Sequence, residues 1–362
     1  MQRPGQFGDA EGVAVRSAIA RVVSSGSYIQ GAEVSLLESE LAQYLGVEAV
    51  VGVACGTDAL ELSLRALGIG AGHRVATVAN AGYYATAAIS AVGALPVLVD
   101  VEAESLQMDP QRLAAALGAG LDAVILTHLF GDAHLAPTIS LLCHDAGVPL
   151  IEDCAQSMGA TIDGVRAGTF GVLSALSFYP TKNLAALGDG GAVAASEPGL
   201  AARVRTSAQH GWGRRFEVMA EGRNSRLDEL QAAVVRVRLP LLDSGNQRRR
   251  EIWSRYSSAV EGTGATMVGD GTSPAHAVHQ SVVRVERRDE VRARLLAAGV
   301  SSDVHYPVPD HRQPLWRERF PDVELPISEA ATAIVLSIPC HPALSDDDVE
   351  RVAAALRTAV QA

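Results

Sequence analysis

The chain has 362 residues, a formal net charge of −11 and 48% hydrophobic residues. This composition fits a globular protein with a large core, excludes disordered and fibrous classes, and argues against a nucleic-acid partner. Lys182 is the single lysine, so arginine supplies the other 29 of the 30 strongly basic residues. We expect the densest basic run, Arg248–Arg250, to be a solvated helix face.

Targeting and redox signals are weak in this sequence. Residues 1–12 lack a charged segment followed by an apolar one, so we expect no signal peptide. No apolar run approaches the roughly 18 residues of a membrane span, so no membrane partner is expected. The four cysteines are scattered without metal-ligand spacing. They predict reduced thiols, no bound metal and a cytoplasmic location.

Short apolar runs alternate with longer helical patterns in the first half of the chain. Because the apolar runs have no polar face, they predict a mostly parallel sheet with helices on both sides. The expected strands are 50–54, 74–78, 96–100, 123–128, 148–153 and 173–179. The expected helices between them are 58–67, 83–92, 110–117 and 137–147.

The second half of the chain has a different sequence pattern. A turn and strand at 188–193 precede a long helical stretch over 226–259, which Pro240 should kink or divide. After Gly262 the residues favour a loop. The elements expected beyond it are a strand at 281–286, a helix at 288–299, a Pro/His-rich loop at 304–314 and a terminal helix from Asp346. We therefore expect a large domain over 1–240 and a smaller α+β domain over 241–362.

Lys182 follows a predicted strand, and its neighbours make it a candidate for chemistry. A lone loop lysine is usually solvated. Asp153 ends another strand, at the edge where open α/β sheets bind ligands. It can pair with a protonated ring nitrogen or cap the next segment. Gly56 and Thr57 enter a helix whose start is either an anion site or an ordinary turn with a Thr cap.

A phosphate site, a carboxylate and one amine together suit pyridoxal 5′-phosphate (PLP). Arginine cannot replace Lys182, because its guanidinium stays protonated and does not form an imine. The P-loop and the G-x-G-x-x-G fingerprint are both missing from the sequence. The missing P-loop excludes that type of phosphate site, and the missing G-x-G-x-x-G fingerprint disfavours a nicotinamide-dependent oxidoreductase.

Three long motifs occur in order: EDCAQ (152–156), SFYPTKN (177–183) and RNSRLDELQAA (223–233). At these residues the chain resembles the DegT/DnrJ/EryC1/StrS family of sugar aminotransferases, and the resemblance covers nearly the whole chain. It implies an α/β protein of PLP fold type I, like aspartate aminotransferase. Such a fold has a large domain with a mostly parallel seven-stranded sheet and a smaller C-terminal α+β domain.

The resemblance also implies roles for the cofactor residues. Lys182 would form the Schiff base with PLP, Asp153 would pair with its pyridinium nitrogen, and Gln156 would lie beside its phenolic oxygen. Tyr83 would stack on the ring, and packing at a helix start is the alternative. Asn224 would reach the phosphate of the neighbouring subunit, which implies a homodimer with shared active sites. The positions that match phosphate-binding residues of the family are Gly56, Thr57 and Ser177.

A second set of residues matches regions where the family binds its sugar nucleotide. Arginine suits a pyrophosphate, because it binds phosphate bidentately. Hydrogen-bonded or solvated loop residues are the alternative, and for the tryptophan–arginine segment a mobile surface loop. The candidates are Tyr179, Trp212, Arg214, Arg215, His305, Tyr306 and His311.

The segment VANAGYYAT (78–86) is one residue longer than is usual in the family. In this it resembles the branch that aminates 3-keto sugars in deoxyamino-sugar and antibiotic biosynthesis. The implied reaction transfers an amino group from L-glutamate, by way of pyridoxamine phosphate, to a dTDP-linked 3-keto-deoxyhexose. A 4-keto-sugar transaminase, a PLP-dependent sugar dehydratase and a non-catalytic regulator on the same fold remain alternatives.

Overall fold

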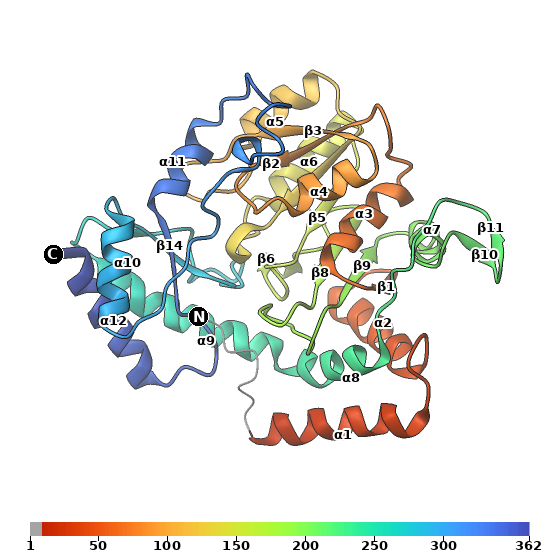
Figure 1. Ribbon diagram of the computed structural model, residues 1–362, viewed down its shortest axis with the longest axis horizontal. Coiled ribbons are helices and arrows are strands. Elements are labelled where there is room, and N and C mark those ends of the chain that lie inside the picture. The colour runs from red at the N-terminus through yellow and green to blue at the C-terminus, as the bar shows by residue number, and fades with distance from the viewer. Residues whose placement is uncertain (1–8, 362) are drawn as a thin grey trace.

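The computed structural model describes residues 9–361, and Figure 1 shows its elements. Residues 1–8 lie outside the described residues. The expected large domain begins in this segment, and most of the region where we predict no signal peptide falls there.

A seven-stranded sheet forms the centre of the molecule, in the order β1-β9-β8-β5-β4-β2-β3. Every strand except β9 runs in one direction, which confirms the mostly parallel sheet. β9 follows β8 without an intervening helix, and a connection without a crossover favours antiparallel pairing. The strands are β1 (Ala49–Val53), β2 (Arg74–Val78), β3 (Leu95–Val99), β4 (Ala123–Thr127), β5 (Leu150–Asp153), β8 (Leu173–Ser177) and β9 (Gly191–Ala195).

Helices cover both faces of this sheet, as expected (Figure 1). On β9, Val193 and Ala195 pack with helices α3, α4 and α7, whereas Ala192 and Ala194 pack with α2 and α8. This alternation is the period of two that a strand with two buried faces requires. The helices of the first half are α3 (Gly56–Ala66), α4 (Tyr84–Ala91), α5 (Pro110–Gly118), α6 (Ala136–Ala146) and α7 (Pro198–Ala208), with the 3-10 turn η1 (Leu129–Gly131).

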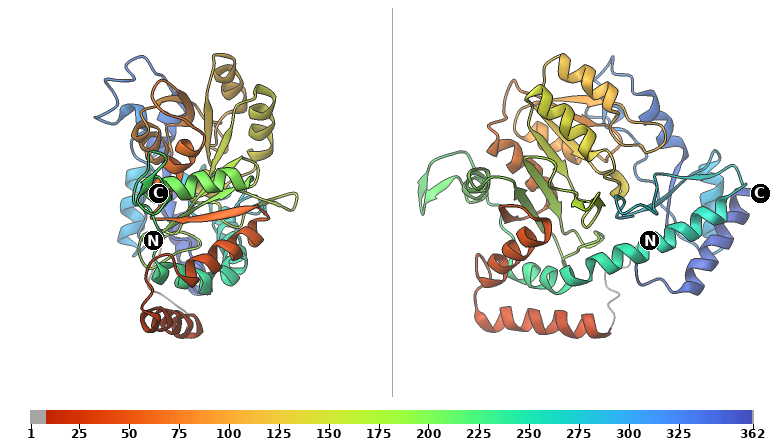
Figure 2. Two further views of the ribbon diagram at one scale, coloured as in Figure 1. Left: turned by 90° about the vertical axis from the view of Figure 1, so that its right-hand side faces the viewer. Right: turned by 180° about the vertical axis from the view of Figure 1, so that it is seen from behind.

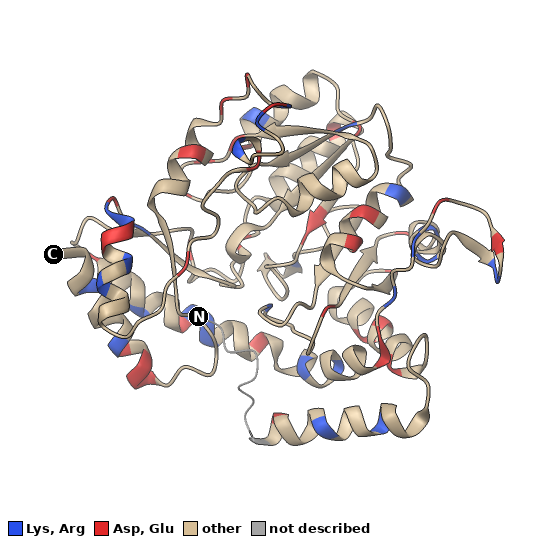
Figure 3. Ribbon diagram, viewed as in Figure 1, with Lys and Arg blue, Asp and Glu red and all other residues tan. Residues whose placement is uncertain are grey.

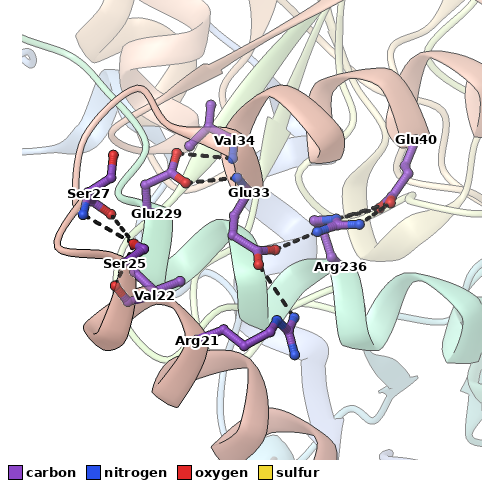
Figure 4. A network of polar contacts seen from close by, with 9 residues as sticks. All are labelled: Arg21, Val22, Ser25, Ser27, Glu33, Val34, Glu40, Glu229 and Arg236. Carbon is purple, nitrogen blue, oxygen red and sulfur yellow. Dashed lines mark hydrogen bonds and ion pairs between the residues drawn. The ribbon is translucent and has the colours of Figure 1, made fainter.

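Two N-terminal helices, α1 (Asp9–Ser25) and α2 (Ala32–Leu45), lie against α8 (Glu229–Arg238). Gly31 precedes α2 and has no side chain to cap it. The buried Glu229 carboxylate replaces that cap, accepting hydrogen bonds from the backbone N–H groups of Gly31, Glu33 and Val34 at 2.7–3.1 Å. Figure 4 shows the contacts with Glu33 and Val34. Arg236 lies about two turns further along the same face of α8 and forms ion pairs with Glu33 and Glu40 of α2.

Pro240 lies in the 3-10 turn η2 (Leu239–Leu241), which separates α8 from α9 (Leu242–Val260) and confirms the predicted division. The expected loop after Gly262 contains a short strand that the sequence did not indicate. The largest hydrophobic cluster joins residues of the sheet with residues of the C-terminal elements, and the domain boundary at 240 stays a prediction. The C-terminal elements are β12 (Thr266–Met267), β13 (Ser281–Arg284), α10 (Arg288–Ala297), η3 (Asp310–Arg312), α11 (Pro326–Ile334), β14 (Val335–Ile338) and α12 (Asp346–Gln361).

Two small hairpins complete the fold. One consists of β6 (Thr161–Ile162) and β7 (Val165–Arg166). The other consists of β10 (Trp212–Arg214) and β11 (Glu217–Val218), and it projects from the body of the molecule in Figures 1 and 2. Within residues 9–361, no helix is long and apolar enough to cross a membrane.

The prediction of a solvated basic face is wrong for Arg249. This side chain is buried, and its guanidinium donates to the carbonyl oxygens of Val278, His279 and Cys340 at 3.4, 3.2 and 2.7 Å. All three carbonyl oxygens accept from Nη1, so this part of the buried guanidinium is satisfied without an acid. Elsewhere, around α10 and α12, basic and acidic residues are interspersed at the surface (Figure 3).

Candidate active site

The two residues with the strongest predicted roles lie at the carboxyl ends of adjacent strands. Asp153 is the last residue of β5, and it pairs in register with Ala175 of β8. Lys182 follows the end of β8 by five residues. Its backbone N–H donates to the Tyr179 carbonyl oxygen at 2.8 Å, closing a tight turn. Parallel strand order therefore brings an acid and an amine to one edge of the sheet.

Asp153 and Lys182 influence each other's protonation. Burial raises the pKa of Asp153, while the Ala155 backbone N–H and the charge of Lys182 oppose that rise. Burial lowers the pKa of Lys182 to about 8, against the attraction of Asp153. A buried amine with such a pKa is available in its uncharged, nucleophilic form near neutral pH. Thr127, which no sequence motif indicated, donates its hydroxyl to Asp153 at 3.3 Å from the end of neighbouring β4.

The lowered pKa of Lys182 predicts how its reactivity depends on pH. In cofactor-free protein, labelling of Lys182 by trinitrobenzenesulfonate should rise with pH through a midpoint near 8, because only the uncharged amine reacts. Asp153→Asn removes an attraction that favours the charged amine, so the midpoint should fall below that of the wild type. Lys182→Arg reports the background from the terminal amine. A midpoint near 10.5, the ordinary lysine value, would contradict the buried site.

The predicted phosphate site forms where α3 begins. Cys55 is the N-cap of α3, and its sulfur accepts the Asp58 backbone N–H at 3.4 Å. Thr57 is therefore not the cap, which removes the ordinary Thr-capped turn as an alternative. A Cβ atom on Gly56 would lie 2.7 Å from the Cβ of Ser177, so glycine is needed for the close approach of α3 to β8. The three predicted phosphate residues thus converge at one helix N-terminus.

Gln156 and Tyr306 meet although they are far apart in sequence. The Gln156 side-chain oxygen accepts the Phe130 backbone N–H at 2.6 Å, which fixes the amide. Its nitrogen lies 3.4 Å from the Tyr306 hydroxyl. A Cβ atom on Gly82 would lie 2.7 Å from the Tyr306 ring, so this ring packs on the segment that the sequence singled out. Tyr83 follows as the N-cap residue of α4.

Both histidines of the Pro/His-rich loop make internal hydrogen bonds. His305 Nδ1 lies 2.9 Å from the Ser337 hydroxyl, and the fully buried His311 has Nε2 2.8 Å from a Glu329 carboxylate oxygen. These contacts favour the hydrogen-bonded alternative that the sequence left open, most clearly for His311. Tyr179 is half exposed beside the lysine turn.

The remaining candidates lie at the surface. Trp212 and Arg214 form β10, and Arg215 follows in the hairpin that projects away from the ends of β5 and β8 (Figures 1 and 2). The structure therefore does not bring this segment to the lysine of the same chain. Asn224 is exposed and lines a cavity of about 330 Å³ with Ala54 and other residues.

The site fits PLP. A buried carboxylate with one amine of lowered pKa beside it, next to a helix N-terminus that requires glycine, matches the ring nitrogen, aldehyde and phosphate of that cofactor. Fold and site together define a PLP-dependent aminotransferase with the aspartate-aminotransferase type of sheet. The chain matches the DegT/DnrJ/EryC1/StrS aminotransferase family over residues 10–357 and belongs to it. It is an aminotransferase, as the sequence resemblance implies.

Individual relatives agree with this class. A dTDP-3-amino-3,4,6-trideoxy-alpha-D-glucose transaminase from Streptomyces venezuelae is 39% identical over 345 residues, 94% of this chain and 90% of that protein. A UDP-2-acetamido-2-deoxy-3-oxo-D-glucuronate aminotransferase from Pseudomonas aeruginosa is 36% identical, over 94% of this chain and 95% of that one. NtdA from Bacillus subtilis, solved with bound cofactor PMP, superimposes with a TM-score of 0.92 at 27% identity, covering 98% of this chain and 83% of NtdA.

Proposed function

We propose that this enzyme transfers an amino group from L-glutamate to the C3 position of a nucleotide-linked 3-keto-deoxyhexose, with dTDP as the nucleotide. The observation that carries the regiochemistry is the segment 78–86, in which Gly82 makes room for the Tyr306 ring beside Gln156. The names of the relatives from Streptomyces venezuelae and Pseudomonas aeruginosa specify 3-amino and 3-oxo sugars, which supports amination at C3. Biosynthesis of a deoxyamino sugar for an antibiotic is the proposed context.

Each cofactor residue then has a task that its surroundings suit. PLP supplies an electron sink that stabilises negative charge at the carbon losing a proton. Lys182 holds the cofactor and, once free, carries that proton at Nζ, for which a pKa of about 8 is suitable. Asp153 keeps a proton on the ring nitrogen. The residues proposed to bind the phosphate are Gly56, Thr57 and Ser177.

The experiment that tests regiochemistry is the reverse reaction. Nucleotide sugars carrying an amino group at C3 or at C4 are incubated with 2-oxoglutarate, and glutamate release is measured. We expect release from the 3-amino sugars only, because the proposal places C3 beside Lys182. Release confined to 4-amino sugars would establish the alternative 4-keto transaminase. Loss of a sugar hydroxyl without glutamate turnover would establish a dehydratase, and PLP binding without any turnover would favour a regulator.

The enzyme is further proposed to be a homodimer with shared active sites. Asn224 is exposed, and the hairpin with Trp212 and Arg214 projects from its own body, so both are free to reach a second copy. Phe216 and Met219 of the hairpin segment are 73% and 68% exposed, and apolar side chains this exposed favour a covering partner.

Mixing two impaired variants tests the shared site. Lys182→Ala and Asn224→Ala subunits, unfolded together and refolded, should recover about a quarter of wild-type activity, because half of the dimers are mixed and each has one intact site. Each variant refolded alone is the control. No recovery in the mixture, with dimers present by light scattering, would contradict the shared site.

A further inference from the structure

Asp310 is a buried acid that contacts the segment 78–86 along its length. Its backbone N–H donates to the Ala79 carbonyl oxygen at 2.8 Å. Its side-chain Oδ2 accepts a hydrogen bond from the Thr86 hydroxyl. The Tyr83 backbone N–H also stabilises the ionised carboxylate. One residue of the Pro/His-rich loop thus binds the beginning and the end of this segment by hydrogen bonds, and its carboxylate faces the Tyr83 backbone N–H in the middle.

Tyr83 needs such external support. Its φ is 78°, in the left-handed region that bulky side chains avoid, and Gly82 before it has φ of 83°. Tyr83 is the N-cap residue of α4 but supplies no side-chain hydrogen bond to the helix. Asp310 binds the first turn of α4 from another part of the chain, because its carboxylate accepts the side-chain hydroxyl of Thr86.

The Tyr83 ring is supported by the same loop region. Trp316 lies with its ring centroid 6.1 Å from that of Tyr83, at an interplanar angle of 52°. Tyr306 packs on Gly82, the neighbouring residue. Asp310 lies between these two aromatic residues in sequence and anchors the backbone that they flank. The direction of the Tyr83 ring therefore depends on contacts from one loop.

A carboxyl group at this place is unfavourable unless its contacts require it. Asp310 is 1% exposed, and burial raises its pKa to about 7 against the two donors that favour ionisation. An apolar side chain would fill the same volume without that desolvation. An acid at this place therefore indicates that the side chain serves as a hydrogen-bond acceptor for Thr86 rather than as packing.

We propose that Asp310 is a positioning residue that fixes Tyr83, through the start of α4, against the cofactor ring. This inference rests on the proposed function, which places PLP beside Tyr83. Asp310 is not among the residues proposed to hold the cofactor or the substrate. Its effect on the cofactor passes through the orientation of the Tyr83 ring.

The first measurement needs no cofactor. In PLP-free protein, Asp310→Leu should speed hydrogen exchange of the amides in residues 82–88 by at least about tenfold, since the contact that holds Thr86 and the start of α4 is lost, while α12 stays unchanged. Asp310→Asn keeps an acceptor of the same size and should restore most of the protection. Asp322→Leu, which removes an exposed acid, is the matched control. Unchanged exchange at 82–88 in Asp310→Leu would overturn the proposal.

The second measurement asks whether the effect passes through Tyr83. Asp310→Leu should weaken PLP binding about tenfold or more and alter the visible circular dichroism of bound PLP. In a Tyr83→Ala background the same substitution should have almost no further effect. Equal losses in both backgrounds would show a structural role only and overturn the proposal. A wild-type protein that takes up no PLP would instead refute the proposed function, even with the exchange result intact.

Discussion

Replacing Lys182 with arginine should lower transamination by about 10²–10⁴-fold or more. Arginine keeps a positive charge near Asp153, but its guanidinium stays protonated, so it can neither bond to the cofactor aldehyde nor accept the migrating proton. Glutamate-dependent amination of the nucleotide sugar measures the loss. In the wild type, borohydride should fix PLP covalently to Lys182, identified by mass spectrometry of the peptide. In the variant no such peptide should form.

Arg112→Lys is the matched control for this experiment. Arg112 lies on the exposed face of α5, so a second lysine there keeps the charge and touches no predicted site residue. This variant should retain activity within about twofold, and borohydride should still label only Lys182. Lys182→Arg protein with more than a tenth of wild-type activity, or labelling at position 112, would contradict the assignment of the single lysine.

Much of the sheet can be predicted because its signals are local. The predicted strand 74–78 coincides with β2, since an apolar run between turn signals has few other structures available. Asp153 and Lys182 follow from the same argument, because residues at the ends of parallel strands share one edge. The predicted helix at 58–67 instead begins at Gly56, because the cap is Cys55, a residue rarely used for capping.

Other features depend on contacts between residues that are distant in the sequence, and no local sequence pattern predicts them. Arg249 belongs to a run of arginines that is typical of a charged helix surface, yet its side chain is buried and donates to the Cys340 carbonyl oxygen. Asp310 sits in a Pro/His-rich loop that predicts exposure, whereas Thr86, more than two hundred residues earlier, supplies its partner. A single sequence carries no signal for such pairings, because neither residue type nor spacing specifies the partner.

The acid next to Asp153 has a different task. Glu152 is fully buried, and its carboxylate accepts the backbone N–H groups of Gly168, Phe170 and Gly171 at 2.7–2.9 Å. It also lies 2.8 Å from His128 Nε2. Cys154 is near enough for these three side chains to resemble a metal site, but both Glu152 oxygens already serve hydrogen bonds. Glu152 ties the loop before β8 to the strand that carries Asp153.

Glu152→Ala should therefore lower the free energy of unfolding by about 3–5 kcal/mol, since each buried donor left without an acceptor costs about 1–3 kcal/mol. The substitution leaves three backbone N–H groups and one imidazole without their acceptor in a buried place, and water cannot replace it without opening the loop. Urea denaturation of cofactor-free protein measures the change without the contribution of bound PLP. Glu197→Ala, at an exposed helix start where the acid makes no capping bond, should change stability by no more than about 0.5 kcal/mol. Equal effects of the two substitutions would mean that the Glu152 hydrogen bonds contribute little, and the position of Asp153 would then depend on the strand pairing alone.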